Sequence, residues 1–248
     1  MWGVPAFALL ALLLIGPGGF NQPLFLALNH ALYLEPGGIW LNITLFGDAG
    51  MIMVLVLPFV GRRPDLIWSG LLAGLIAAIL INGGKELFMI DRPPSVLAAG
   101  QFHQIGNRFG ALSFPSGHTA AGFALAGVVA QLDFSPRVRV GMLLFATLIG
   151  LSRIAIGAHW PMDIAGGMLV GWIAALAGVA LAGRISGEGL AIQRGCALLL
   201  LFTVFYLVFL HKSGDAEARL LEIIIPLVCL GLALPGLKKL FLPGAAHE

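Results

Sequence analysis

Residues 158–183 read AHWPMDIAGGMLVGWIAALAGVALAG and contain no charged side chain after Asp163. The apolar stretch 162–183 is long enough to cross the hydrocarbon core of a bilayer, which takes an α-helix of roughly 20 residues. Further apolar stretches lie at about 4–17, 49–60, 66–84, 118–133, 138–152, 195–210 and 220–236. The pattern predicts an all-α, polytopic integral membrane protein, a helical bundle with eight spans.

The composition excludes several other classes of protein. Of the 248 residues, 59% are hydrophobic and 10% are charged, and the mean hydropathy is +0.97. A soluble domain has about 25% charged residues, so a soluble enzyme, a secreted disulfide scaffold and a disordered chain are excluded. Transmembrane β-strands alternate over about 10 residues, whereas these apolar runs are continuous. The net charge of +2, without a run of Lys or Arg, gives no indication of a nucleic-acid partner.

The N-terminal region is expected to hold a retained helix followed by an interfacial one. No basic residue precedes the apolar run 6–15, and no small-x-small cleavage site follows it, so a signal peptide is not indicated. Residues 23–34 begin with a proline and end before Gly37, which is typical of a short helix lying in the membrane interface. The interfacial stretch is placed at about 20–46, of which 39–46 is expected to extend the second span.

The Lys and Arg residues indicate how the spans are oriented. With the N-terminus in the cytoplasm, alternating passes place eight of the fourteen on the cytoplasmic side, in agreement with the positive-inside rule. Cations kept on the outer side against this preference indicate a functional site there. The cations in question are Lys85, Arg92, Arg108 and Arg153, and the other two on the outer side are Lys212 and Arg219.

Two polar segments are expected at that outer face. Lys85 and Arg92 are seven residues apart, about two helical turns, so both can lie on one face before Pro93 ends the helix. Ser116 and Gly117 open the fourth span, where backbone N–H groups form an anion site. In isolation, the first segment could be two cations reaching the interface from a helix end, and the second a simple helix cap.

A third segment contains Arg153, His159 and Asp163. Pro161 fits the first position of the sixth span, so Asp163 lies in the first turn and can reach back to one ring nitrogen of His159. Two alternatives stay open. His159 and Asp163 could be a pair of metal ligands, which the surrounding cations disfavour, or Asp163 could be a structural cap.

The topology brings the three segments together. Between His118, beside the second segment, and Ser152 lie 33 residues, enough for one pass inward and one back. Three cations, an anion-binding turn, two histidines and a carboxylate therefore converge on one face. This set suits a doubly charged oxyanion whose transition state spreads charge over its equatorial oxygens, and it indicates phosphoryl chemistry.

In combination, the segments resemble the three signature motifs of the type 2 phosphatidic acid phosphatase (PAP2) superfamily, over roughly residues 40–183. The resemblance implies a six-span core, no metal or other cofactor, and an active site at the outer membrane–water boundary. Residues 1–183 are therefore assigned to the phosphatase core and 184–248 to an added C-terminal transmembrane helical hairpin. The motif residues are Lys85, Arg92, Pro93, Pro115, Ser116, Gly117, His118, Ser152, Arg153, His159 and Asp163.

The resemblance also implies roles for eight of the motif residues. His159 would be the nucleophile that forms a phosphohistidine, with Asp163 orienting it. His118 would protonate the leaving oxygen and then activate water. The phosphoryl oxygens would be held by Lys85, Arg92, Ser116, Gly117 and Arg153.

The function that the resemblance implies is metal-independent removal of a terminal phosphate from a membrane lipid, with undecaprenyl pyrophosphate favoured. The location implied is a bacterial inner membrane with the site facing the periplasm or outside. Lipid A 1-phosphate, phosphatidylglycerophosphate and phosphatidic acid stay open as substrates, as do phosphoryl transfer to a second lipid and binding without chemistry. The outer loop 95–114 is expected to contribute to specificity through Gln101, His103, Asn107 and Arg108.

Overall fold

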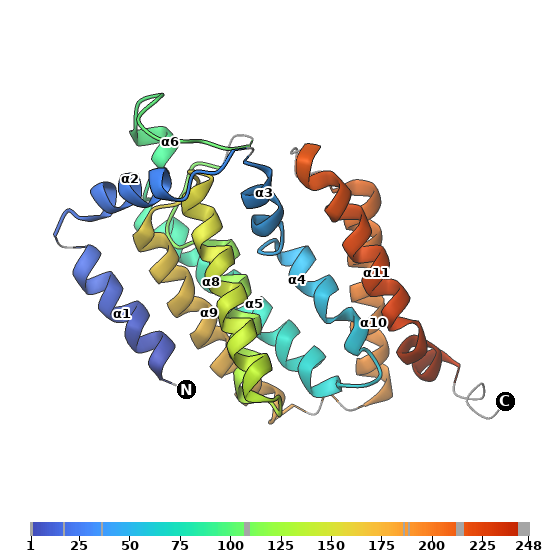
Figure 1. Ribbon diagram of the computed structural model, residues 1–248. Helices are drawn as coiled ribbons and strands as arrows, with labels where there is room; N and C mark the ends of the chain where they lie inside the picture. Colours follow the sequence, from blue (N-terminus) through green and yellow to red (C-terminus); the bar gives the residue numbers. More distant parts are fainter. Residues whose placement is uncertain are drawn as a thin grey trace.

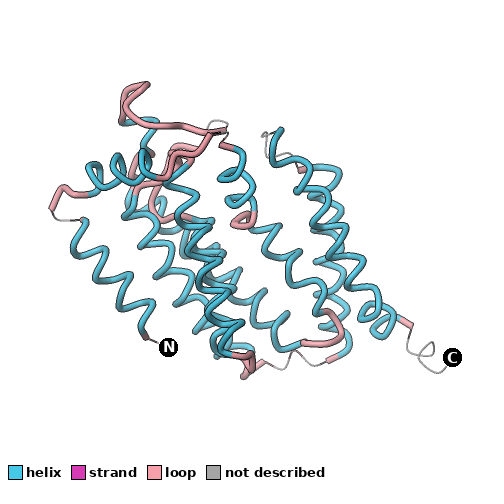
Figure 2. Tube along the Cα trace, viewed as in Figure 1, coloured by secondary structure: helices cyan, strands magenta, loops and turns pink. Residues whose placement is uncertain are grey.

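The computed structural model describes residues 2–16, 18–35, 37–106, 110–185, 187, 189–211 and 216–242, and within these ranges it is a helical bundle without strands (Figures 1 and 2). The predicted all-α class is confirmed, and each predicted apolar stretch coincides with a helix. The elements are α1 (Gly3–Ile15), α2 (Asn21–Ala31), α3 (Gly38–Leu45), α4 (Ala49–Val56), η1 (Leu57–Phe59), α5 (Pro64–Phe88), α6 (Pro93–Val96), α7 (Gly117–Gln131), α8 (Pro136–Ala155), α9 (Pro161–Ala182), α10 (Leu190–Phe205), η2 (Tyr206–Leu210) and α11 (Ala216–Phe241).

The number of spans is lower than the eight expected. Among the described residues, five helices are long and apolar enough to cross a membrane, or six if the bent pair formed by 38–45 and 49–59 is one span. The helices α1 and α7 have 13 and 15 residues, hence about 20 and 22 Å at 1.5 Å per residue, against about 30 Å of hydrocarbon. By length and composition, the count of eight is therefore wrong.

The second span is broken rather than extended. Helices α3 and α4 meet at an angle of 63°. A Cβ added at Gly47 would lie 2.6 Å from Ile149 Cγ2 and 2.8 Å from His118 Cβ, so no larger residue fits at the break. Asp48 Oδ1 then caps α4 by accepting from the N–H groups of Gly50 and Met51, at 2.8 and 3.2 Å. The expectation that 39–46 continues the second span without interruption is wrong, because the cap at Asp48 starts a new helix.

The centre of the bundle is built by close approach of α9 to α7 and α5. A Cβ at Gly167 would lie 2.6 Å from the carbonyl oxygen of Ser116, and a Cβ at Gly171 would lie even closer to the carbonyl oxygen of Ala120. Farther along α9, a Cβ at Gly178 would lie 2.7 Å from the backbone nitrogen of Ala73 in α5. The absence of side chains at these glycines lets the helix backbones touch, which is how small residues pack helices in membranes.

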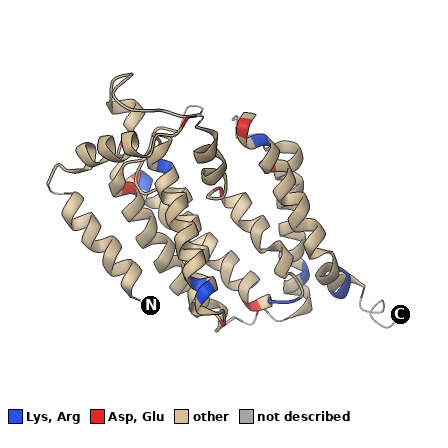
Figure 3. Ribbon diagram, in the orientation of Figure 1, with Lys and Arg blue, Asp and Glu red and all other residues tan. Residues whose placement is uncertain are grey.

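Other helices surround this centre. Helix α1 packs on α9, while α11 packs on η1, α3 and α4, so the N-terminal and C-terminal helices lie on opposite sides of the bundle (Figure 1). Helix α2 covers most of the short helix predicted at 23–34 and lies across one end of the bundle. Lys and Arg gather toward the two ends, and the middle is almost free of charge over the described residues (Figure 3).

The glycine contact at Gly171 should be a determinant of stability. Replacing Gly171 with Ala is expected to lower the free energy of unfolding by about 1–3 kcal/mol, the usual cost of overpacking. The reason is that the added methyl meets the backbone of α7, which cannot move aside. The loss should appear as a lower melting temperature of the purified protein in detergent.

Gly141 of α8 is the matched control, since a Cβ there meets no atom within 4 Å. Gly141→Ala should leave the melting temperature unchanged or slightly raised, because Ala favours a helix over Gly by up to about 1 kcal/mol. Equal losses in the two variants would contradict the close-packing interpretation.

Candidate active site

The predicted site residues come together at one end of the bundle, where α5 and α8 end and α7 and α9 begin. Each is placed by a helix terminus. The last turn of α5 carries Lys85, the last turn of α8 carries Arg153, and Ser116 is the N-cap of α7. The remaining predicted residues of this group are Arg92 before α6, Gly117 and His118 in the first turn of α7, and His159 and Asp163 at the start of α9.

His159 and Asp163 form the buried pair that the sequence predicts. The Nδ1 atom of His159 lies 3.1 Å from Asp163 Oδ2, and the exposed fractions of the two residues are 1% and 0%. The same carboxylate oxygen accepts the N–H of Trp160 at 2.8 Å, as an acidic residue in a first helical turn commonly does. Because Nδ1 is engaged by the carboxylate, Nε2 is the nitrogen left for chemistry.

Ser113 contacts both members of this pair, and sequence reasoning did not predict its role. Its Oγ donates a short hydrogen bond to Asp163 Oδ2 and lies 3.3 Å from His159 Nδ1. Its own N–H donates to the carbonyl of Ile90 at 2.7 Å, which fixes the loop before α7 against the segment after α5. Its position three residues before Ser116 was visible in the sequence, but no spacing rule marks that position as part of a site.

The turn that opens α7 is tied directly to α9. The N–H of Ser116 donates to the carbonyl of Asp163 at 3.0 Å. Its Oγ accepts from the hydroxyl of Thr119 at 2.9 Å and from the N–H of Thr119 at 3.4 Å, so Ser116 is a true N-cap. The predicted anion turn and the predicted histidine–carboxylate pair are therefore one connected structure.

Two buried arginines are held in place by neutral oxygens. Arg92 donates from Nε to the carbonyl of Leu112 and from Nη1 to the carbonyl of Ala158, both at 3.2 Å. Arg153 donates from Nη1 to the hydroxyl of Thr44 in α3 at 2.6 Å. The exposed fractions of Arg92 and Arg153 are 8% and 5%, so two guanidinium groups sit at fixed positions where water is largely excluded.

The positively charged side chains around His159 affect its protonation. The pKa of His159 is held well below its ordinary value of 6.5, first by burial and then by the positive charges of neighbouring side chains. The imidazole is therefore neutral at neutral pH and carries a lone pair. The neighbours responsible are Arg92, Arg153, His118 and Lys85.

His118 is more exposed than His159. It is partly exposed, and together with Gly117 it borders a cavity of about 890 Å³ that runs away from the site. His118 therefore lies at the junction of the site and this cavity. Among the described residues, no three His, Cys, Asp or Glu side chains are grouped so that they could hold a metal ion.

Of the residues expected to give specificity, His103 and Gln101 contact α2 and Tyr33, which follows it. The ring of His103 stacks on Tyr33 with centroids 3.7 Å apart, and it meets His30 edge to face at 5.1 Å. The carbonyl of Gln101 lies 3.2 Å from His30 Nε2. Asn107 and Arg108 lie outside the described residues.

Asn29 is the second residue that sequence reasoning missed. It is fully buried in α2. Its Nδ2 donates to the carbonyls of His103, Ile154 and Ala155 at 2.9, 3.0 and 3.2 Å, and its Oδ1 accepts the N–H of His103 at 2.8 Å. One amide therefore joins α2, the outer loop and the end of α8 next to Arg153.

Comparisons with known proteins match the family that the three motifs resemble. Residues 65–185 match the model of the PAP2 superfamily. The chain is 27% identical over 161 residues to undecaprenyl-diphosphatase of Sulfolobus acidocaldarius, a match that covers 64% of this chain and 77% of that protein. It is 31% identical over 120 residues to lipid A 1-phosphatase of Rhizobium johnstonii, covering 47% of this chain and 45% of that protein.

A solved structure also matches. The crystal structure of Aquifex aeolicus LpxE superposes with a TM-score of 0.57 at 26% identity, covering 64% of this chain and 94% of LpxE. The site, the apolar helices and these matches define an integral membrane phosphatase. The chain belongs to the PAP2 superfamily through residues 65–185.

The contacts of Asn29 lead to a prediction about the outer loop. Asn29→Ala should lower the free energy of unfolding by about 1–3 kcal/mol, because it leaves buried backbone groups without partners. It should also speed proteolysis within residues 97–106, measured by limited digestion in detergent.

Asn82→Ala is the control, since the exposed amide of Asn82 bonds only to the Ala78 carbonyl of its own helix. Its melting temperature and digestion pattern should match the wild type. A loop as resistant in Asn29→Ala as in Asn82→Ala would show that Asn29 does not hold it.

Proposed function

We propose that the protein hydrolyses the terminal phosphate of a membrane lipid phosphate or diphosphate through a phosphohistidine on His159. The observation that carries the proposal is the Ser113–Asp163–His159 arrangement, in which Nδ1 is held and Nε2 is left free of the carboxylate. Pure anion binding needs cations and N–H donors but no nucleophile oriented in this way.

In the proposed first step, Nε2 of His159 attacks phosphorus and the bond from phosphorus to the leaving oxygen breaks. His118 donates its proton to that oxygen. The imidazole of His159 gains positive charge as the bond forms, and Asp163 Oδ2 at 3.1 Å stabilises that charge. Ser113 holds the carboxylate in line by its hydrogen bond.

In the second step, His118 takes a proton from water, and the resulting hydroxide attacks the phosphohistidine. The bond from phosphorus to Nε2 breaks, and inorganic phosphate and the original imidazole are released. Throughout, the charge on the phosphoryl oxygens is offset by fixed donors that need no rearrangement during the reaction. These donors are Lys85, Arg92, Arg153 and the turn at Ser116 and Gly117.

The proposed substrate is undecaprenyl diphosphate, the substrate in the name of the Sulfolobus relative. A second candidate is the 1-phosphate of lipid A, favoured by the 31% identity to the Rhizobium lipid A 1-phosphatase. We assign the site to the outer face of a bacterial cell membrane, because eight of the fourteen Lys and Arg residues lie at the opposite end of the helices, which the positive-inside rule then assigns to the cytoplasm. These eight are Arg62, Arg63, Arg137, Arg139, Arg184, Arg194, Lys238 and Lys239.

The first test is release of inorganic phosphate by the purified protein in detergent with EDTA, from a panel of lipid mono- and diphosphates. His159→Ala and His118→Ala should each lower kcat by about a thousandfold or more, since each removes a group that forms or breaks bonds. Radiolabelled substrate should leave an acid-labile label on wild type and none on His159→Ala.

Unchanged melting temperatures in both variants are the control for folding. Full turnover in His159→Ala would refute the covalent mechanism, and an acceptor lipid that gains label in place of water would identify a phosphotransferase.

Ser113 is proposed as a positioning residue, so its removal should impair the reaction without abolishing it. Ser113→Ala should lower kcat by about tenfold and leave KM within about twofold, because Asp163 loses a donor while the phosphate-binding cations stay in place. Ser113→Thr keeps the hydroxyl and should recover most of the activity.

Ser152→Ala is the matched control. Ser152 is equally buried, but its Oγ donates to the Ile149 carbonyl of its own helix at 2.6 Å. An equal loss of kcat in Ser152→Ala would mean that Ser113 acts only through stability.

A further inference from the structure

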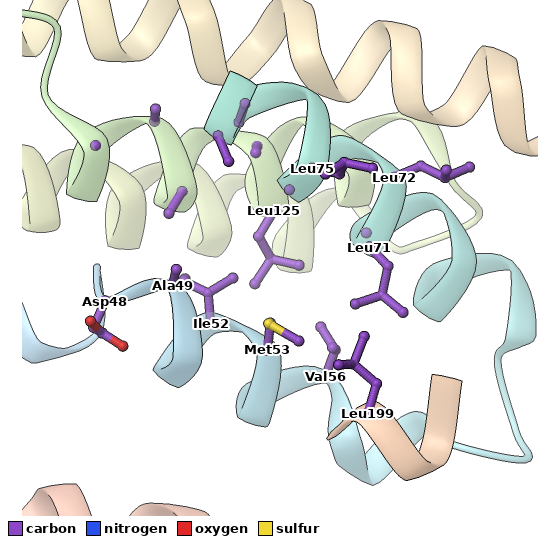
Figure 4. Close-up of a pocket in the computed structure, with 18 of the residues that line it drawn as sticks. Asp48, Ala49, Ile52, Met53, Val56, Leu71, Leu72, Leu75, Leu125 and Leu199 are labelled. Carbon is purple, nitrogen blue, oxygen red and sulfur yellow. The ribbon is translucent and has the colours of Figure 1, made fainter. Parts of the chain in front are cut away.

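A long apolar groove runs from the candidate active site into the bundle. It is the cavity of about 890 Å³ between α4, α5, α7 and α10, and side chains of these helices line it (Figure 4). Its site end is bordered by Gly117 and His118, and nearly all of the remaining lining is apolar. A cavity that joins a phosphate site to an apolar groove suits an amphiphile with a phosphate head and a hydrocarbon chain.

The groove is long enough for such a chain. Along α5 its lining extends from Asn82, near the site, to Trp68, a separation of fourteen residues and therefore about 21 Å. One leaflet of the hydrocarbon core measures about 15 Å, half of the whole. A chain whose phosphate lies at His118 can therefore follow the groove through one leaflet.

The groove also opens sideways. Leu75 of α5 and Leu199 of α10 line it, yet their exposed fractions are 60% and 47%. Both residues lie in helices that are long and apolar enough to cross a membrane, so we infer that a lipid chain enters the groove between α5 and α10.

Helix α10 forms the wall of the groove at the end farthest from the candidate active site. Its lining residues recur at the spacing of a single helical face. Cys196 and Trp68 also share a second, smaller cavity, which places this face of α10 beside the start of α5, opposite the site. Helix α10 lies outside the segment 65–185 that defines the family. Its lining residues are Ile192, Gly195, Cys196 and Leu199.

We propose that α10 is a specificity element that selects the apolar chain of the lipid phosphate by contacting the part of the chain farthest from the phosphate. This inference rests on the proposed function. It assigns to the hairpin 184–248 a role in substrate selection: the family segment binds and cleaves the phosphate, and α10 limits which chains fit behind it.

Glycines in the groove wall allow a test that spares the fold. A Cβ added at Gly195 meets no atom within 4 Å, so Gly195→Leu fills the groove and does not clash with the backbone. Gly231 of α11 is equally open and does not line the groove. Gly231→Leu is therefore a matched control with the same substitution on the other helix of the hairpin.

The experiment compares kcat/KM for undecaprenyl diphosphate and farnesyl diphosphate, which share the diphosphate and the isoprenoid chemistry and differ in chain length. In Gly195→Leu, the ratio of the long-chain to the short-chain value should fall at least about tenfold. In Gly231→Leu it should stay at the wild-type value. An unchanged ratio in Gly195→Leu, or an equal fall in Gly231→Leu, would overturn the proposal.

A labelling experiment separates failure of this inference from failure of the proposed function. A long-chain isoprenyl diphosphate with a photoreactive group at the depth of Trp68 should label peptides from residues 190–205, even in His159→Ala. Label confined to other segments would overturn the role of α10. Label on α10 in a wild-type protein that releases no phosphate would support the groove and reject the phosphatase proposal.

Discussion

The candidate site depends on one carboxylate oxygen, Asp163 Oδ2. It accepts from the Trp160 N–H and from the Ser113 hydroxyl, and it lies 3.1 Å from His159 Nδ1. The first contact is local to the start of α9, whereas the second comes from a loop fifty residues earlier. Because the backbone of Asp163 also accepts the Ser116 N–H, the same residue fixes the anion-binding turn. The orientation of the imidazole and the position of the predicted anion-binding turn are therefore set together.

Burial strengthens the electrostatic effect of Arg92 and Arg153 at the candidate site. With both arginines at 8% exposure or less, their charges act across a region of low dielectric, where electrostatic interactions are stronger than in water. The carbonyls and the hydroxyl that accept hydrogen bonds from them fix their direction. That arrangement costs folding free energy, since buried cations lose hydration. Close packing of α9 against α7 at their glycine contacts offsets this cost and helps to bury the arginines.

In the proposed function, the groove and the site divide recognition of a lipid phosphate between two parts of the chain. The family segment contains the groups that fit a phosphate, and these are indifferent to what the phosphate is attached to. Helices α4 and α10, outside that segment, supply much of the apolar wall. Hydrocarbon recognition depends on volume and shape rather than on directional bonds, so this wall can vary while the phosphate chemistry stays the same.

The sequence alone determined the features that depend on short-range regularity. Apolar runs fixed the helices, and the four-residue spacing of His159 and Asp163 predicted their contact, because a helix start brings such residues together. The tertiary structure decided what depends on distant segments. The roles of Ser113, Asn29 and Thr44 rest on partners 46 to 126 residues away. The groove behind His118 arises from packing between helices, which no local pattern encodes.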